Sequence, residues 1–108
     1  MNILDTIVEH KRIEILKRKQ KRSLTDLESF SFYGRQTNSI KLPEEGMPGI
    51  IAEFKRQSPS KGPLNLEATP ADVARGYHLA GASVMSVLTD RKFFGGSFQD
   101  LSGVREAC

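Results

Sequence analysis

The sequence predicts an α/β fold in which two parallel strands are joined by a crossover helix. Two short apolar runs, residues 49–55 and 83–88, lie about 30 residues apart, a spacing typical of a strand-helix-strand unit. A helical pattern separates them, and each run ends in polar residues. Because parallel strands covered on both faces are near-continuously apolar, we expect both runs to be buried in one sheet.

The composition is that of an ordinary globular protein. The chain has 108 residues, of which 38% are hydrophobic and 27% charged. Its one cysteine, Cys108, excludes an internal disulfide, and no apolar run reaches the roughly 18 residues needed to cross a membrane. Asp5 and Glu9 interrupt the first ten residues, which therefore do not resemble a secretory signal. We expect a cytoplasmic protein with no membrane partner.

A basic amphipathic helix is predicted over residues 2–19. Apolar residues at helical spacing predict a stripe that faces the core: Ile3, Leu4, Ile7, Val8, Ile13 and Leu16. Basic residues cover the remaining surface: Lys11, Arg12, Lys17, Arg18, Lys19, Lys21 and Arg22. Such a helix can bind nucleic acid, but no aromatic residues interleave with the charges, so we favour a solvated face.

Three further segments complete the helical pattern. Residues 23–32 predict a short helix, and residues 36–48 a connector without periodicity. Residues 70–80 predict the crossover helix, with Thr69 as N-cap, Pro70 in the first turn and Gly81 as the stop. Its expected inner face consists of Val73, Tyr77 and Ala80.

A last helix is expected after the turn-rich sequence R-K-F-F-G-G. Ser97 is its predicted N-cap, with Asp100 three residues later. The helical spacing falls on Phe98, Leu101, Val104 or Arg105, and Cys108. Because two strands alone do not make a covered sheet and no helix stop precedes Cys108, we expect the first part of a larger α/β domain.

The first strand carries charge where it ends. Side chains alternate along a strand, so Glu53 and Lys55 share one face with Ile51. The other face is apolar and consists of Ile50, Ala52 and Phe54. A buried ion needs a partner, solvent or a charged ligand, so the pair is equally compatible with a structural ion pair and a binding site.

Residues 56–69 form a loop longer than the usual 2 to about 6 residues, as binding loops often do. The loop offers hydroxyl groups, positive charges and a flexible glycine: Ser58, Ser60, Arg56, Lys61 and Gly62. These groups suit a phosphate or a carboxylate. The same S-P-S-K-G sequence is also compatible with a solvated turn.

Three motifs occur in order along the chain: I-I-A-E-F-K-R-Q-S-P-S-K-G at 50–62, A-G-A-S-V-M-S-V-L-T-D at 80–90 and F-F-G-G-S-F-Q-D-L at 93–101. Together they resemble the opening of the indole-3-glycerol phosphate synthase family of tryptophan biosynthesis. The family's I-L-x-x-I-V-x-x-K-R pattern is also present at residues 3–12. The resemblance implies the N-terminal part of a (βα)8 TIM barrel, which needs about 250 residues. Residues 1–48 would form a helical extension and connector, and residues 49–108 the first two βα units, where the barrel is truncated.

The resemblance also implies a carbon-carbon lyase that needs neither a metal nor an organic cofactor. Its partner would be a small phosphorylated substrate, 1-(2-carboxyphenylamino)-1-deoxyribulose 5-phosphate, and not nucleic acid. This substrate is ring-closed, decarboxylated and dehydrated to indole-3-glycerol phosphate.

By motif, the resemblance assigns catalysis to Lys55, as proton donor near the substrate's carboxylate, and to Glu53, which orients polar groups. Ser58 matches a loop serine at the substrate, and Phe94 an aromatic that packs on the anthranilate ring. Arg56 and Ser60 are further binding candidates. Without the resemblance, the Phe93-Phe94 pair is better explained as core.

Two alternatives differ in class from this lyase. One is a non-catalytic module that binds anions or nucleic acid through the basic helix, and the other is a different phosphate-handling barrel enzyme. The family's second catalytic lysine, its carboxylate base and its phosphate cradle would lie beyond Cys108. We therefore expect the 108-residue chain to be inactive alone and to self-associate or pair with the rest of the barrel.

Overall fold

The computed structural model describes residues 2–41 and 43–108. The chain forms two compact units, residues 1–39 and residues 40–108. The predicted division, after residue 48, lies nine residues beyond this boundary, at the end of the connector. Within the described residues this connector contains no helix or strand.

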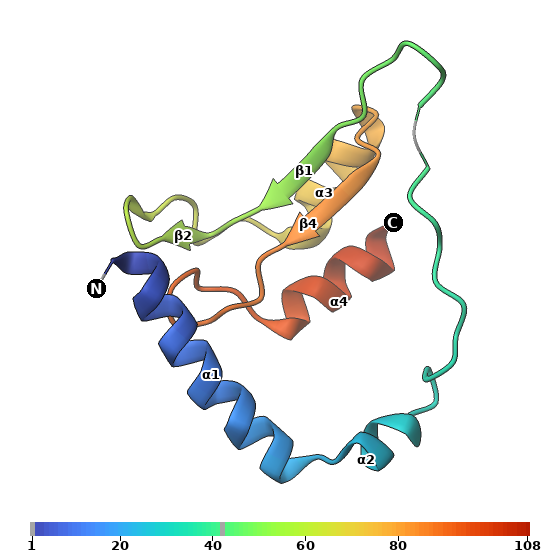
Figure 1. The fold of residues 1–108 in the computed structure, drawn as a ribbon. Coiled ribbons are helices and arrows are strands. Elements are labelled where there is room, and N and C mark those ends of the chain that lie inside the picture. The colour runs from blue at the N-terminus through green and yellow to red at the C-terminus, as the bar shows by residue number, and fades with distance from the viewer. Residues whose placement is uncertain (1, 42) are drawn as a thin grey trace. The chain divides into compact units, whose positions relative to one another are not determined.

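The first unit contains the predicted N-terminal helix, α1 (Ile3–Lys21, Figure 1). Asn2 caps it, because its side-chain oxygen accepts a hydrogen bond of 2.8 Å from the Asp5 backbone N–H. The Asp5 carboxylate accepts a weaker bond of 3.4 Å from the Asn2 backbone N–H, which completes a capping box. The helix is confirmed, with Asn2 as its cap.

The predicted core-facing stripe of α1 is wrong. No residue of α1 is buried, and Ile3, Leu4, Ile13 and Leu16 are all exposed. Ile15, two positions after Ile13, lies about 200° around the helix from it, so the apolar residues do not share one face. No helix within residues 2–41 and 43–108 is both long and apolar enough to cross a membrane.

The second helix, α2, spans Leu24–Glu28 and is shorter than predicted. Ser23 caps it in a second capping box, and the hydrogen bond from the Ser23 backbone N–H lowers the pKa of Asp26. Its C-cap is Ser29, whose hydroxyl donates to the Asp26 carbonyl oxygen at 2.6 Å.

In the second unit, β1 (Ile51–Phe54) and β4 (Val84–Val87) pair in parallel, as predicted (Figure 1). The crossover helix α3 (Pro70–Leu79) connects them. The register places Glu53 opposite Ser86. The predicted α/β arrangement with a parallel sheet is therefore confirmed.

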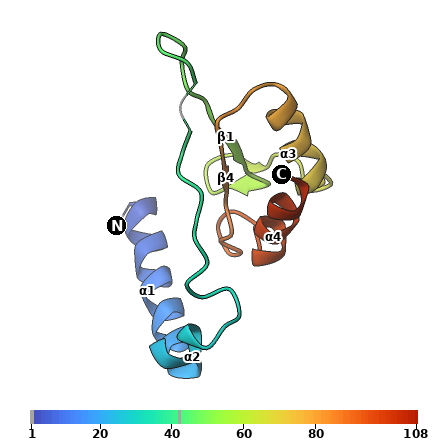
Figure 2. The same cartoon turned by 90° about the vertical axis from the view of Figure 1, so that its right-hand side faces the viewer.

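One face of this strand pair forms the core. Helices α3 and α4 (Phe98–Ala107) pack against each other on the same side of the pair (Figure 2). The buried apolar side chains are Ala52, Phe54, Ala74 and Val104. The predicted alternation along β1 is confirmed, but burial on both faces is wrong, because Ile51 is 69% exposed.

The inner faces of the two helices differ from those predicted. Ala74, rather than Tyr77 or Ala80, is the buried residue of α3. In α4 the buried residues are Asp100 and Val104, whereas Phe98 and Leu101 are exposed. Helices α3 and α4 thus pack through fewer buried side chains than their apolar patterns predicted.

The long loop contains a short antiparallel pair that was not predicted, β2 (Gln57–Ser58) and β3 (Gly62–Pro63). Gly62 has a φ of +63°, a conformation that favours glycine. The S-P-S-K-G sequence is therefore the tight turn of a small hairpin.

Candidate active site at the carboxyl end of β1

Glu53 and Lys55 lie at the carboxyl end of β1. Strand alternation places both on the uncovered face, where the Lys55 Nζ lies 3.5 Å from Glu53 Oε1. The Lys55 side chain is 36% exposed and the Glu53 side chain 43%. An ion pair this exposed contributes about 0 to 1 kcal/mol, so it is a weak stabiliser and an accessible charged site.

Ser86 is a site residue that the sequence analysis missed. It lies opposite Glu53 in the β1–β4 register, and its hydroxyl donates to Glu53 Oε2 at 3.1 Å. Glu53 thus has one carboxylate oxygen near Lys55 and the other bonded to Ser86. The available sequence signal was the one polar residue in the run V-M-S-V.

The structure brings Phe94 to Lys55. The Lys55 Nζ lies 6.0 Å from the centre of the Phe94 ring, at the outer limit of a cation–π contact. The loop that carries Phe94 is fixed, since the Asp90 carbonyl oxygen accepts the Gly96 N–H at 2.7 Å. A side chain at Gly96 would collide with the Leu88 carbonyl oxygen. Only glycine fits there.

Ser58 and Ser60 lie together in the hairpin turn. Their hydroxyl oxygens are 3.5 Å apart, and Ser58 Oγ accepts the Lys61 backbone N–H at 3.2 Å. Within the described part of the chain, no hydrogen bond joins either hydroxyl to Glu53 or Lys55. The serines form a separate polar group on the loop that follows these residues.

Arg56 has other partners, although it directly follows Lys55. Its guanidinium donates two bonds of 3.0 Å to the Asp100 carboxylate. It also donates to the carbonyl oxygens of Leu66 and Ala68, at 3.1 and 2.9 Å. The hydrogen bonds to Asp100 raise the pKa of Arg56. These contacts leave about one N–H donor for any ligand.

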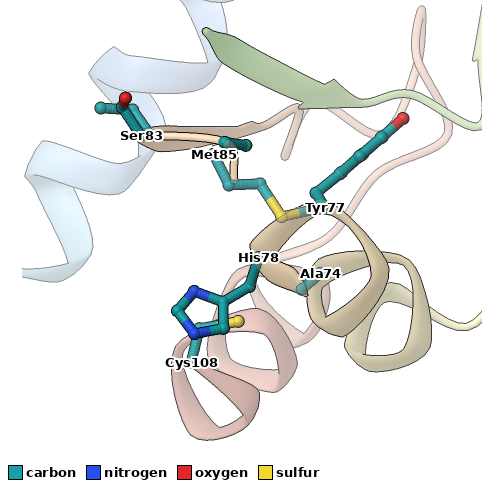
Figure 3. A pocket seen from close by; sticks show the side chains of 8 residues that line it. Ala74, Tyr77, His78, Ser83, Met85 and Cys108 are labelled. Carbon is teal, nitrogen blue, oxygen red and sulfur yellow. The ribbon is translucent and has the colours of Figure 1, made fainter. Parts of the chain in front are cut away.

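A pocket of about 110 Å³ lies elsewhere, beside the amino-terminal end of β4 (Figure 3). Residues of α3, β4 and the end of α4 line it, among them Tyr77, His78, Met85 and Cys108. No predicted site residue contributes to it. Ligands of parallel sheets bind outside the carboxyl ends of the strands, so we place the candidate site at Glu53 and Lys55 instead.

Known proteins resemble this chain over nearly its whole length. Residues 4–108 match the sequence model of a family described as Indole-3-glycerol phosphate synthase. A protein of that name from Bacteroides thetaiotaomicron is 43% identical over 105 residues, which cover 96% of this chain and 40% of the relative. A Nocardioides protein of that name is 40% identical, with 99% of this chain and 42% of the relative covered. A Microcystis aeruginosa protein of that name is 39% identical, with 98% and 37% covered. The chain thus spans about 40% of the length of these curated relatives.

Proposed function

Since the chain belongs to the indole-3-glycerol phosphate synthase family, we propose that it supplies the first part of the active site of such a synthase. The substrate would be 1-(2-carboxyphenylamino)-1-deoxyribulose 5-phosphate, and the products indole-3-glycerol phosphate, CO2 and water. The observation that carries this proposal is the exposed Glu53–Lys55 pair beside Phe94 at the carboxyl end of β1.

Lys55 and Phe94 together suit an aromatic carboxylate. The ammonium group pairs with the carboxylate, and the phenyl ring of Phe94 offers a face or edge for the substrate ring. An aliphatic acid would use only the ammonium group. The juxtaposition therefore favours the carboxyphenyl end of the substrate at this position.

The reaction requires an acid, and Lys55 can be that acid. Ring closure forms a bond to the ketone carbon and builds negative charge on the ketone oxygen. The carboxyl group then leaves as CO2, and the former ketone oxygen leaves as water. The departing oxygen needs protons, and the Lys55 ammonium can supply one. Glu53 keeps the ammonium in place, and Ser86 fixes the Glu53 carboxylate from the neighbouring strand.

Ser58 and Ser60 are proposed to bind the substrate rather than to transform it. Their adjacent hydroxyls donate to anionic or hydroxylated groups, and they lie on a short hairpin beyond the strand that carries Lys55. In this proposal residues 49–108 form the first two βα units of a (βα)8 barrel, and residues 1–48 form the extension and connector. The parallel pair with both helices on one side fits a barrel with an outer ring of helices.

The assay measures CO2 and indole-3-glycerol phosphate formed from the synthetic substrate by a full-length synthase that carries this segment. We expect CO2 and indole-3-glycerol phosphate in equimolar amounts. The Glu53→Gln variant should form neither product. The control variant Arg75→Ala, which alters the exposed Arg75–Asp72 pair of α3, should form both. No product from the folded enzyme, together with salt-dependent RNA binding, would favour the nucleic-acid alternative.

The 108-residue chain alone is proposed to be inactive and to associate with itself or with the remaining barrel. Ile51 is 69% exposed on the uncovered face of the strand pair, and association would cover such a residue. Light scattering over a concentration series should show a mass that rises with concentration. A monodisperse monomer at every concentration contradicts self-association.

A further inference from the structure

Arg56, the first residue of the long loop, contacts the returning half of that loop. Its backbone carbonyl oxygen accepts the N–H groups of Leu64 and Asn65, at 2.8 and 3.2 Å. Its guanidinium donates to the carbonyl oxygens of Leu66 and Ala68. The hairpin that carries Ser58 and Ser60 is thus enclosed between contacts to one residue.

The guanidinium also fixes this loop to α4. The two parallel hydrogen bonds to the Asp100 carboxylate are the fork geometry in which arginine binds most strongly. Asp100 is buried in the first turn of α4, and its backbone N–H donates to the capping Ser97 hydroxyl at 3.1 Å. The loop is therefore attached to the end of a helix that packs in the core.

The Arg56 side chain lies on the opposite side of the strand from the residues proposed to contact substrate. Its guanidinium carbon lies 5.1 Å from the centre of the buried Phe54 ring, whereas Glu53 and Lys55 lie on the opposite, uncovered face of the strand. The contact with Phe54 and the bond to Asp100 both belong to the helix-covered side.

We propose that Arg56 is a positioning residue, which holds the loop of residues 56–69 in the shape that presents the Ser58 and Ser60 hydroxyls on the loop following the Glu53–Lys55 pair. This inference rests on the proposed function for its catalytic consequence. Lysine cannot replace Arg56, because a single ammonium group lacks the planar fork that reaches one carboxylate and two carbonyl groups together.

The first test measures amide hydrogen exchange in the full-length synthase carrying Arg56→Lys. A second variant, Arg56→Met with Asp100→Leu, removes both charges and so leaves no unpaired buried ion. In both variants we expect exchange to rise at least about tenfold at the N–H groups of Leu64 and Asn65, with amides of α3 unchanged. Arg75→Lys is the matched control, because it alters an exposed ion pair. Unchanged loop exchange, or an equal rise throughout the second unit, overturns the proposal.

The second test separates positioning from general stability through kinetics of the full-length synthase. The doubly substituted variant should raise KM up to about tenfold and change kcat less, as Ser58→Ala alone should. Adding Ser58→Ala to it should raise KM no further, because the serine is already displaced. If the increases in KM caused by the double substitution and by Ser58→Ala multiply in the combined variant, the proposal is overturned. Absence of synthase activity in the parent enzyme would contradict the proposed function, while the exchange result would still decide the role of Arg56 in the loop.

Discussion

Two adjacent residues of this chain, Lys55 and Arg56, form ion pairs of opposite character. The Lys55–Glu53 pair is joined by a single 3.5 Å contact between side chains that are 36% and 43% exposed. The Arg56–Asp100 pair is joined by two hydrogen bonds of 3.0 Å between side chains that are 17% and 11% exposed. One step along the chain reverses the face that the side chain occupies.

The difference shows how one short segment can supply both an accessible charged group for a reaction and a buried ion pair that stabilises the fold. An exposed pair adds little stability and keeps its charges accessible to a ligand. Loss of one partner from a buried pair leaves the other ion uncompensated in the interior. We therefore expect substitutions at Lys55 to affect turnover, and substitutions at Asp100 to affect folding.

The largest expected effect is that of Lys55→Ala on turnover in the full-length synthase. Loss of a positioned acid should lower kcat by about 10² to 10⁴-fold, while the melting temperature stays within a few degrees. Steady-state kinetics and thermal melts on the same samples measure both quantities. A folded variant with near-normal kcat would remove Lys55 from the mechanism.

Asp100→Ala should produce the converse result. It leaves the Arg56 guanidinium without its carboxylate, and we expect the free energy of unfolding to fall by about 3 kcal/mol. Asp72→Ala, at the exposed Arg75–Asp72 pair, should cost less than about 1 kcal/mol. Urea unfolding of the full-length protein compares the two variants. Equal losses would show that burial does not distinguish these pairs.

A smaller effect is expected for Ser58→Ala. The hydroxyl contributes one hydrogen bond of about 0.5 to 1.5 kcal/mol to ground and transition states alike, so KM should rise by up to about tenfold with kcat nearly unchanged. Substrate titrations measure both constants. A large fall in kcat at constant KM would assign Ser58 to the chemical step instead.

The smallest predicted effect is that of Ser86→Ala, which removes one of the two partners of Glu53. Because Lys55 still restrains the carboxylate, kcat should fall by only about threefold. The combined variant Ser86→Ala with Lys55→Ala should be no slower than Lys55→Ala alone, since Ser86 acts through the pair. A further threefold loss would indicate an independent role for Ser86.

Local patterns in the sequence predicted the features that depend on neighbouring residues. The alternation through Ile51 and Glu53, and the N-cap at Ser97, follow from spacing alone, and the structure confirms them. Features that depend on distant partners were missed. The bond from Ser86 to Glu53 requires the register between two strands, and the burial of Asp100 requires Arg56, 44 positions away, as its counter-ion.

The apolar stripe of α1 failed for a related reason. Helical spacing shows which residues share a face, but burial also needs a packing partner, and Ile13 and Ile15 point in different directions. The loop hairpin escaped prediction because each of its strands has only two residues, too few for any alternation to be visible.

The contacts of Arg56 also determine how much the length of the hairpin turn can vary. Hydrogen bonds to Leu64, Leu66 and Ala68 fix the returning half of the loop independently of residues 59–61 at its tip. Loop-closure entropy grows slowly, by about 0.6 kcal/mol for each doubling of length. Added residues at the tip should therefore be inexpensive for folding, whereas the same additions after Leu64 would shift the carbonyl groups that the guanidinium binds.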